Sequence, residues 1–452
     1  MDSFNMENAQ QMLDFAKANL LLVGIFALFF VGMIISKNVY DRLMHFTIFV
    51  AALGALNDFA LAKAVQERYF NVRTLYKNSL SRLEKVDTFP TKAVVYADQI
   101  RNCEDIVLNE DAGFAILSCD PTRDFWNAVM DIRISPNGTG SLYLWSYATS
   151  PPSLRPITFS DFPAGTTDFH PLGIDYDAAT STLYAVDHAR SGLRVDVFRL
   201  DPPTARASLL TTLADPTHLR TPNGVAALSP TELLVTNDHF FVSDERPWLA
   251  LLETYLSLPL SWVTGVRLAP DDTSAAGGAG VKPAYGLAAD GIPFANGIAR
   301  LNATHVVVAA CTRPGLYLYS LAEPAEPAPP KLVFERYVRT PVMVDNVSVD
   351  SAGKVLFSGH PDAAALVNVS KTNHAFDLDA KGEEGEKARE GRPRSGSWVG
   401  EWDPVEGTLR DLFVDDGTVY GSSSSAVRDV KRGLTLVVGL YERGVLMAET
   451  GA

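Results

Sequence analysis

Short apolar runs recur along most of the chain, each bounded by turn-forming residues. Seven of them have the length and composition of β-strands, at residues 113–118, 141–145, 182–186, 232–235, 305–309, 355–358 and 435–440. Closely spaced strands without long intervening helices indicate an all-β protein rather than a parallel α/β sheet. Because roughly 360 residues are too many for one sandwich, the pattern predicts a six-bladed β-propeller over residues 88–452, with about 60 residues per blade.

Four further runs begin with a small turn and continue as an aliphatic strand. They read Leu172-Gly-Ile-Asp, Asn223-Gly-Val-Ala, Asn296-Gly-Ile-Ala and Asp345-Asn-Val-Ser. The innermost strand of each propeller blade begins at one mouth of the central channel. We therefore expect the residues that head these runs to lie close together.

The amino-terminal segment has a different character. Nineteen uncharged residues separate Lys17 from Lys37, which is about the length needed to cross a bilayer. We interpret residues 1–37 as a leader and membrane anchor, and a cleaved signal peptide is the alternative.

Residues 38–87 are predicted to form a helical linker. Its apolar positions step by four and three at Leu61, Val65, Tyr69, Val72, Tyr76, Leu80 and Leu83. This spacing is typical of an amphipathic helix. The helix could lie on a membrane surface, or it could pack its apolar stripe on the following domain.

Two segments interrupt the strand pattern. Residues 240–266 contain a strongly apolar stretch from Pro247 to Trp262, which we interpret as a helix or lid that could touch a membrane, roof a pocket or simply pack. Residues 381–397 are rich in Glu, Lys, Arg and Gly, and we predict a solvated loop there.

The overall charge limits the possible partners. Thirty-nine basic and 53 acidic residues give a net charge of −14, so no basic surplus exists to replace the counterions of a nucleic acid. Three cysteines, Cys103, Cys119 and Cys311, permit one disulfide and require none. No protein partner can be inferred.

Five scattered polar residues have the chemistry of a calcium site. They are Glu104, Asn223, Asn296, Asp345 and Asn346. Carboxylate and amide oxygens are the ligands that a hard cation takes, and these residues recur at roughly blade-length spacing. The sequence therefore predicts one calcium ion on the propeller axis.

The motifs around these residues resemble those of a known family. Cys-Glu-Asp, Thr-Asn-Asp-His, Phe-Ala-Asn-Gly, Val-Asp-Asn-Val-Ser-Val-Asp and Gly-His-Pro follow one another as in the serum paraoxonase/arylesterase family of calcium-dependent six-bladed propellers. The resemblance runs from about Val95 to Ala448. It implies that the five residues bind the catalytic calcium and that the protein hydrolyses aryl esters and lactones. No serine nucleophile is implied, which agrees with the absence of a Gly-x-Ser-x-Gly motif.

The resemblance also assigns further residues. A second, structural calcium would use Asp105 and the carbonyl of Ile174, but Gly224 stands where the family has an aspartate. The general base would be His188 supported by Asp238. Leu172 stands where the family has a second histidine, and His170 lies two residues earlier. His239 and His360 are expected near the substrate pocket, as is Leu172.

Disulfide and sequon positions bear on the compartment. The cysteines that close the family's propeller have no counterparts here, so closure would depend on strand pairing. Sequons at Asn137, Asn302 and Asn368 favour the secretory lumen or exterior, whereas Lys37 and Arg42 after the apolar segment favour a cytosolic propeller. We expect a membrane-anchored protein on the lumenal side. The alternative functions are hydrolysis of sugar lactones and a non-catalytic, calcium-stabilised binding propeller.

Overall fold

The computed structural model describes residues 78–450, except for residues 136, 163–166, 272–279 and 324–326. Within these residues the chain forms six large sheets and one short hairpin, and every strand pair is antiparallel except that of β9 with β13. The hairpin consists of β5 (Trp126–Asn127) and β6 (Ile132–Arg133). The all-β prediction is confirmed.

The first three blades follow each other in the sequence. The first comprises β3 (Cys103–Asn109), β4 (Phe114–Cys119), β7 (Ser141–Ser146) and β8 (Ser153–Pro156). The second comprises β10 (Pro171–Asp177), β11 (Thr182–Asp187), β12 (Arg194–Asp201) and β13 (Arg206–Leu213), with β9 (Thr158–Ser160) at its edge. The third comprises β14 (Pro222–Ser229), β15 (Glu232–Asn237), β16 (Ser261–Asp271) and β17 (Gly280–Ile292).

The last three blades repeat this order. The fourth comprises β18 (Ala295–Arg300), β19 (His305–Ala310), β20 (Gly315–Leu321) and β21 (Leu332–Arg339). The fifth comprises β22 (Met343–Val349), β23 (Val355–His360), β24 (Ser397–Trp402) and β25 (Leu409–Asp415), with β1 (Val86–Asp87) at its edge. The sixth comprises β26 (Ser423–Asp429), β27 (Leu434–Gly439) and β28 (Val445–Glu449), with β2 (Lys92–Val95) as its outer strand.

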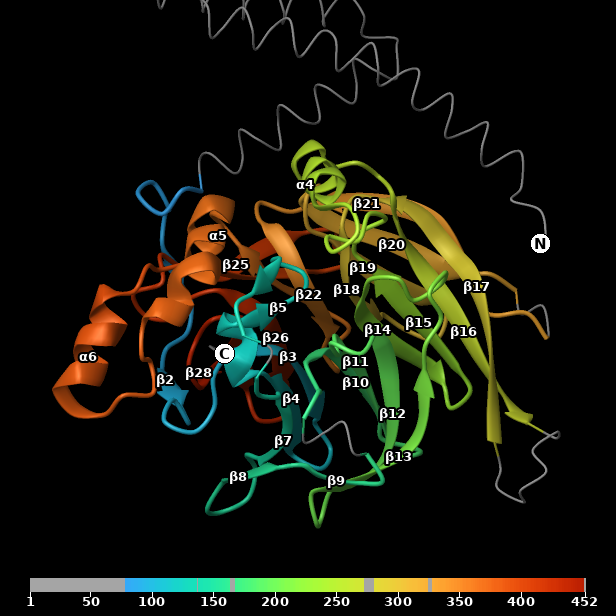
Figure 1. Cartoon of the computed structure of the whole chain (residues 1–452), viewed down its shortest axis with the longest axis horizontal. Coiled ribbons are helices and arrows are strands. Elements are labelled where there is room, and N and C mark those ends of the chain that lie inside the picture. Colours follow the sequence, from blue (N-terminus) through green and yellow to red (C-terminus); the bar gives the residue numbers. More distant parts are fainter. Residues whose placement is uncertain (1–77, 136, 163–166, 272–279, 324–326, 451–452) are drawn as a thin grey trace, which may run out of the picture. The chain divides into compact units, whose positions relative to one another are not determined.

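The six inner strands form a closed ring. β3, β10, β14, β18, β22 and β26 each contact the inner strands of both neighbouring blades, and Figure 1 shows them grouped around a common centre. β2 pairs with β28 from Lys92–Ala448 to Val95–Val445, so a strand from before the first blade completes the sixth. This confirms the prediction of a six-bladed propeller closed by strand pairing.

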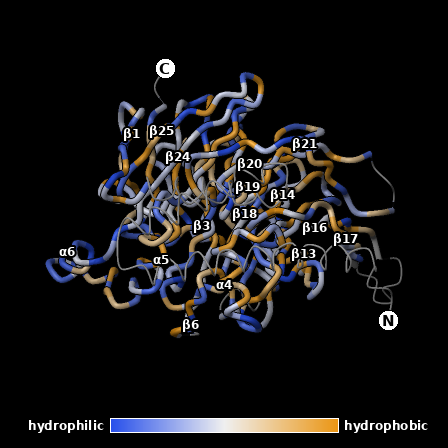
Figure 2. Tube along the Cα trace, turned by 90° about the horizontal axis from the view of Figure 1, so that it is seen from above, coloured by the Kyte–Doolittle hydropathy of each residue, from blue (hydrophilic) through white to orange (hydrophobic). Residues whose placement is uncertain are grey.

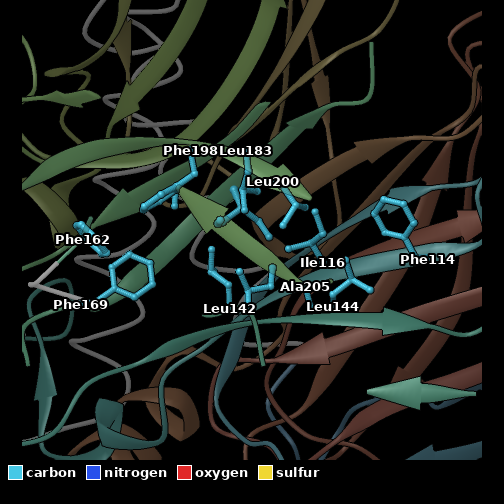
Figure 3. Close-up of a cluster of buried hydrophobic side chains, with 14 residues drawn as sticks. Phe114, Ile116, Leu142, Leu144, Phe162, Phe169, Leu183, Phe198, Leu200 and Ala205 are labelled. Atoms are coloured by element: carbon cyan, nitrogen blue, oxygen red, sulfur yellow. The ribbon is translucent and has the colours of Figure 1, made fainter. Parts of the chain in front are cut away.

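A hydrophobic cluster fills each gap between neighbouring blades. Figure 3 shows the cluster between the first and second blades, which includes Ile116 from β4 and Phe198 from β12. Because side chains alternate along a strand, Ala115 and Leu117 of β4 point to the other face and join the cluster shared with the sixth blade. Six of the seven predicted strands are second strands of their blades and are buried on both faces, which explains their uninterrupted apolar runs. The seventh, at residues 141–145, is the third strand β7 and is buried mainly on one face.

The described helices lie in connections between strands. α4 (Pro247–Leu256) confirms the helix predicted within residues 240–266. α5 (Ala363–Thr372), the 3₁₀ turn η3 (Asn373–Ala375) and α6 (Gly382–Gly391) connect β23 to β24, and the 3₁₀ turn η1 (Pro121–Asp124) follows β4. The predicted apolar stretch from Pro247 to Trp262 contains all of α4 and the first two residues of β16.

The prediction of a loop at residues 381–397 was wrong, because residues 382–391 form α6. Glu383 and Glu384 lie in its first turn and Arg389 in its last, where each charge favours the helix dipole. Glu383 also forms an ion pair with Lys387 one turn later, at 2.9 Å. Figure 2 shows α6 as strongly hydrophilic, and this composition concealed the helix from a search for apolar periodicity.

The predicted anchor falls in residues 1–77, outside the described residues. Of the predicted helical linker, only residues 78–87 are described, and they form turns followed by β1. Leu83 and Val86 pack against the cluster between the fourth and fifth blades. Over the part of the chain that the structure describes, no helix combines the length and apolarity needed to span a bilayer.

Candidate metal centre

Each inner strand has an irregularity near its first residue. Ladder pairing is interrupted at Glu104 in β3, at Leu172 and Gly173 in β10, at Asn223 and Gly224 in β14, at Asn296 and Gly297 in β18, at Asp345 and Asn346 in β22, and at Ser424 in β26. A β-bulge bends its strand and redirects a side chain. All five predicted calcium ligands lie at these bulges.

The glycines that follow three of these residues allow the inner strands to approach closely. A Cβ on Gly173 would lie 2.5 Å from the carbonyl oxygen of Asn223, and one on Gly297 would lie 2.5 Å from Oδ1 of Asn346. These distances are too short for any side chain, so the packing of the inner strands requires glycine at both positions. The close approach brings the neighbouring polar residues together.

The five predicted ligands form a buried cluster in which each exposes 6% or less of its surface. Nδ2 of Asn346 donates to Oε1 of Glu104 at 2.8 Å, and Nδ2 of Asn296 donates to Oδ1 of Asp345 at 2.8 Å. Asn223 lies on β14, the strand between β10 and β18, and donates to Oδ2 of Asp238 at 3.1 Å. The amide N–H groups are thus turned toward carboxylates.

Three oxygens of this cluster have no hydrogen-bond partner. They are Oε2 of Glu104, Oδ1 of Asn223 and Oδ1 of Asn296. Buried polar atoms are almost always paired, and an oxygen left unpaired loses its hydration without compensation. One carboxylate and two amide oxygens are ligands suited to a hard cation, so the residues fit calcium.

The cluster contains more amides than carboxylates. Across the described residues, no group of three or more His, Cys, Asp or Glu side chains is arranged to hold a metal. Only Glu104 and Asp345 of the cluster belong to these residue types, because the other three ligands are asparagines.

Burial also affects the charge of the cluster. It raises the pKa of Glu104 well above its usual value, and the nearby carboxylates of Asp105 and Asp345 raise this pKa further. The guanidinium of Arg123 and the hydrogen bond from Asn346 act in the opposite direction.

The predicted second site takes a different form. Asp105 and Ile174 do meet, but Oδ2 of Asp105 accepts the backbone N–H of Ile174 at 2.9 Å. Oδ2 of Asp175 accepts the N–H of Ala227 in the same way, at 2.7 Å, and so links the next pair of blades. Burial raises the pKa of Asp105 to about 6. The carboxylate of Asp105 therefore already joins two inner strands.

A cavity of about 670 Å³ follows the channel beyond the cluster. Its lining includes residues of all six inner strands. Asp105, Ile174 and Asn346 lie near the starts of these strands, and Glu110, Asp177 and Arg428 lie near their ends.

His188, the predicted base, is buried beside β14. Its Nε2 lies 2.6 Å from the carbonyl oxygen of Pro222, so this nitrogen carries the hydrogen, and its buried Nδ1 has no partner. Burial lowers the pKa of His188, although the Pro222 contact and Asp238 act in the opposite direction. The lowered pKa favours the neutral imidazole, in which Nε2 carries the hydrogen and the lone pair of Nδ1 has no partner.

Asp238, the predicted partner of His188, bonds elsewhere. Its Oδ1 lies 2.8 Å from Nδ1 of His239, and its Oδ2 accepts from Asn223. Nε2 of His239 in turn meets the hydroxyl of Thr254 in α4, at 2.7 Å. Asp238 thus connects a predicted ligand to α4.

The remaining predicted pocket residues differ in their surroundings. Nε2 of His360 lies 2.8 Å from Oδ2 of Asp345, next to the cluster. Leu172 is 4% exposed and packs in the hydrophobic cluster between the second and third blades.

Sequence reasoning missed the residues that η1 adds. Asp120 caps η1 and lies 2.8 Å from Nδ1 of His170, while Arg123 and Asp124 are each 2% exposed. Asp-Pro-Thr is a recognisable helix start, since aspartate favours the N-cap and proline the first turn. The motif indicates a turn at this point of the sequence, but it does not indicate that the turn packs next to His170.

The fold and cluster define a six-bladed propeller with a buried group of carboxylate and amide side chains where its inner strands begin. A family model described as Arylesterase matches residues 132–376, which is more than half of the chain. The chain belongs to the arylesterase family.

Individual relatives share less than a third of their aligned residues with this chain. Serum paraoxonase/arylesterase 1 of Rattus norvegicus is 28% identical over 239 residues, which cover 51% of this chain and 60% of the relative. Serum paraoxonase/arylesterase 2 of Canis lupus familiaris is 28% identical over 204 residues, or 44% of this chain and 51% of the relative. The chain thus spans 60% or less of the length of these curated relatives.

Among solved structures, the gluconolactonase XC5397 of Xanthomonas campestris aligns with a TM-score of 0.45 and 13% identity, covering 80% of this chain and 91% of that chain. An alignment this loose says nothing about the chemistry of the present chain.

Proposed function

We propose that this protein hydrolyses carboxylic esters, namely aryl esters and lactones, in a reaction that depends on calcium. The observation that carries the proposal is the set of three unpaired, buried oxygens on Glu104, Asn223 and Asn296. Membership of the arylesterase family supports the same class of reaction. Glu104, Asn223, Asn296, Asp345 and Asn346 would hold the ion.

When bound, calcium polarises the substrate carbonyl and stabilises the negative charge that develops on its oxygen. The chain's own residues prepare this position. Oε2 of Glu104 and Oδ1 of Asn223 and Asn296 would hold the ion directly, since none of them has another partner. Oε1 of Glu104 and Oδ1 of Asp345 accept amide hydrogens from Asn346 and Asn296, and these bonds orient both carboxylates. His360 keeps its contact to Oδ2 of Asp345 and so fixes the orientation of that carboxylate.

His188 supplies the base in this proposal. Its Nε2–H is held by Pro222, so the free Nδ1 is the nitrogen that can accept a proton from water. Pro222 directly precedes Asn223, and the strand that carries a ligand therefore also orients the base. Attack of water on the carbonyl breaks the ester bond and yields a carboxylate, an alcohol and one proton.

The experiment that tests the proposal measures hydrolysis and calcium binding on the same full-length protein. Phenyl acetate and an aliphatic lactone should be hydrolysed in calcium and not in excess chelator, with activity restored when calcium is added back. Calorimetry should detect one calcium ion per chain. Normal hydrolysis by a variant with both Glu104→Gln and Asn223→Ala would refute the site.

A non-catalytic propeller is the second candidate, and the packing of Leu172 in the core favours it. In that case calcium should raise the unfolding temperature without any hydrolysis of either substrate. Appearance of hydrolysis only in a Leu172→His variant would support this candidate.

A further inference from the structure

Arg123 is a buried cation with which no carboxylate of the described residues forms an ion pair. One terminal nitrogen of its guanidinium donates to the carbonyl oxygen of Pro171 at 2.9 Å, while its buried Nε has no partner. Arg123 exposes only 2% of its surface. A charge buried in this way is costly unless it is paired, so the unused Nε–H of Arg123 is suited to an anionic group.

The adjacent acidic residue cannot serve as that anion. Asp124 forms an ion pair with Arg101 through Oδ2, and its Oδ1 accepts from Asn102 at 3.1 Å and from Asn373 at 2.8 Å. Its charge is therefore already balanced. These bonds also fix η1 against η3, so they hold the neighbouring Arg123 in place.

Asp120, at the start of η1, is engaged as well. Its Oδ1 accepts the backbone N–H and the hydroxyl of Thr122, and its Oδ2 contacts His170. Both oxygens thus accept from other groups, and the charge of Arg123 acts on Asp120 only at longer range, where it helps to lower the pKa of this carboxyl against the opposing effect of burial. Nε of Arg123 keeps an unused N–H.

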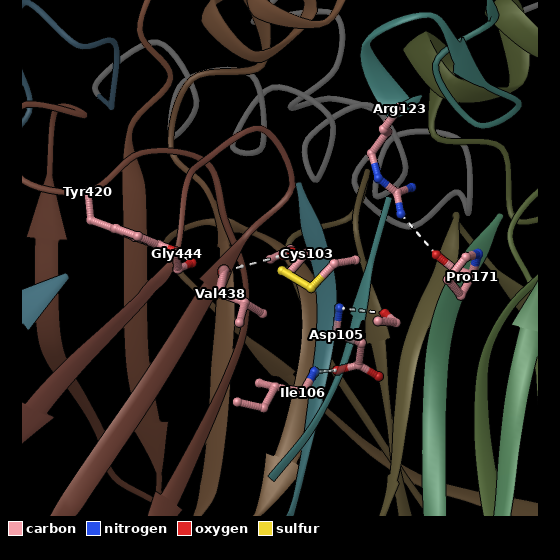
Figure 4. The surroundings of a disulfide bond; sticks show 11 residues. Cys103, Asp105, Ile106, Arg123, Pro171, Tyr420, Val438 and Gly444 are labelled. Atoms are coloured by element: carbon pink, nitrogen blue, oxygen red, sulfur yellow. Dashed lines mark hydrogen bonds between the residues drawn. A yellow bond between two sulfur atoms is a disulfide. The ribbon is translucent and has the colours of Figure 1, made fainter. Parts of the chain in front are cut away.

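Arg123 lies within electrostatic range of the candidate site. Burial is the largest cause of the pKa shift of both Glu104 and His188. The positive charge of Arg123 is a smaller cause, and it lowers both pKa values. Figure 4 shows its bond to Pro171, the residue before the β10 bulge. An anion bound by Arg123 would therefore lie beside the residues proposed to perform the hydrolysis.

We propose that Arg123 binds a carboxylate on the substrate, so that the preferred substrates are esters or lactones that carry a second, anionic carboxyl group. This inference rests on the proposed function, since it specifies the substrate for the same site. The planar guanidinium presents N–H donors that match the two oxygens of a carboxylate, and charge-assisted bonds of this kind are strong. Hydrolysis would then release a dicarboxylate and an alcohol.

The test compares two esters with the same leaving group, phenyl acetate and monophenyl glutarate. For the full-length protein with calcium, Arg123→Gln should lower the ratio of kcat/KM for monophenyl glutarate to that for phenyl acetate by at least about tenfold. The loss should appear mainly in KM, and Arg123→Lys should restore part of it. Arg133→Gln is the matched control, because Arg133 of β6 already forms ion pairs with Asp131 and with Asp244, which precedes α4. This variant should leave the ratio unchanged.

A binding measurement separates this inference from the proposed function. Glutarate, titrated calorimetrically into the calcium-loaded protein, should bind at least about tenfold more weakly to Arg123→Gln than to the wild type. This loss supports the anion site even if neither ester is hydrolysed, a result that would refute the proposed function alone. An unchanged ratio and unchanged glutarate affinity in Arg123→Gln would overturn the inference. If that variant does not fold, wild-type protein that binds glutarate no better than neutral glutaramide overturns it equally.

Discussion

Nδ2 of Asn346 lies 2.8 Å from Oε1 of Glu104, although 242 positions separate the two residues in the sequence. Glu104 belongs to the first blade and Asn346 to the fifth, so only the closed ring of inner strands brings them together. The sixth blade, completed by β2, lies between them. Closure of the propeller and assembly of the candidate metal centre are therefore one event.

The first prediction concerns the charge of Glu104. Glu104→Gln keeps an oxygen that can accept from Asn346 but removes a buried negative charge near Asp105 and Asp345. Calcium affinity should fall at least about tenfold, because affinity depends on the number of charged ligands. In chelator, however, the variant should unfold at a higher temperature than the wild type, since it no longer buries an unbalanced charge.

The measurement is a thermal unfolding curve with and without calcium, together with a calcium titration. Glu449→Gln, at the exposed end of β28, is the control and should change neither curve. If Glu104→Gln bound calcium as tightly as the wild type, Glu104 would not be a ligand.

The second prediction concerns His188. His188→Gln should lower kcat by about 10²- to 10⁴-fold, the usual contribution of a positioned base. Because burial lowers the pKa of His188, its imidazole gains a proton at a lower pH than an ordinary histidine, whose pKa is about 6.5. Wild-type activity should therefore decline only at more acidic pH, where His188 gains a proton.

His305→Gln is the control, since His305 lies at the partly exposed start of β19. A pH–rate profile and kcat should be measured for both variants. Full activity in His188→Gln, with a loss in His170→Gln instead, would transfer the role of base to the His170–Asp120 pair.

The third prediction concerns the close approach of the inner strands at Gly297. A methyl group there would lie 2.5 Å from Oδ1 and 2.6 Å from Cα of Asn346. Gly297→Ala should therefore destabilise the protein by about 1–3 kcal/mol and weaken calcium binding, because one strand must shift. Denaturant unfolding measures the loss. Gly391→Ala is the control, as its nearest neighbour would lie 3.7 Å away; equal stability of both variants would contradict the tight ring.

The strands and ligands could be predicted because a local pattern marks each of them. Leu183 and Val307 belong to second strands that are buried on both faces, so their runs are apolar throughout. Asn223 and Asn296 precede glycines that the axis requires. In both cases a requirement of the fold, burial on both faces or close approach of the inner strands, determines the types of a few consecutive residues.

The residues in the connections between strands have no such pattern. The contact between Asp124 and Asn373 spans 249 positions, and each residue lies in a connection whose composition indicates only a turn or a polar helix. Asp238 was paired with His188 by the resemblance, yet its carboxylate bonds to His239, the next residue in the chain. Which partner a side chain takes depends on the direction in which it points, and the periodicity of the sequence does not indicate that direction.

The last prediction concerns two sequons that the structure separates. Asn302 is exposed between β18 and β19, whereas Asn346 is 3% exposed and its amide contacts Glu104. If the propeller faces the secretory lumen, as its sequons favour, the full-length protein from secretion-competent cells should carry a glycan at Asn302 and none at Asn346. Glycopeptide mass spectrometry after enzymatic deglycosylation measures both sites, with Asn302→Gln as the control that loses its signal. A protein without glycans at any exposed sequon would argue against the lumenal location. A glycan on Asn346 would contradict the metal centre itself, because a glycosylated amide cannot lie within the ring beside Glu104.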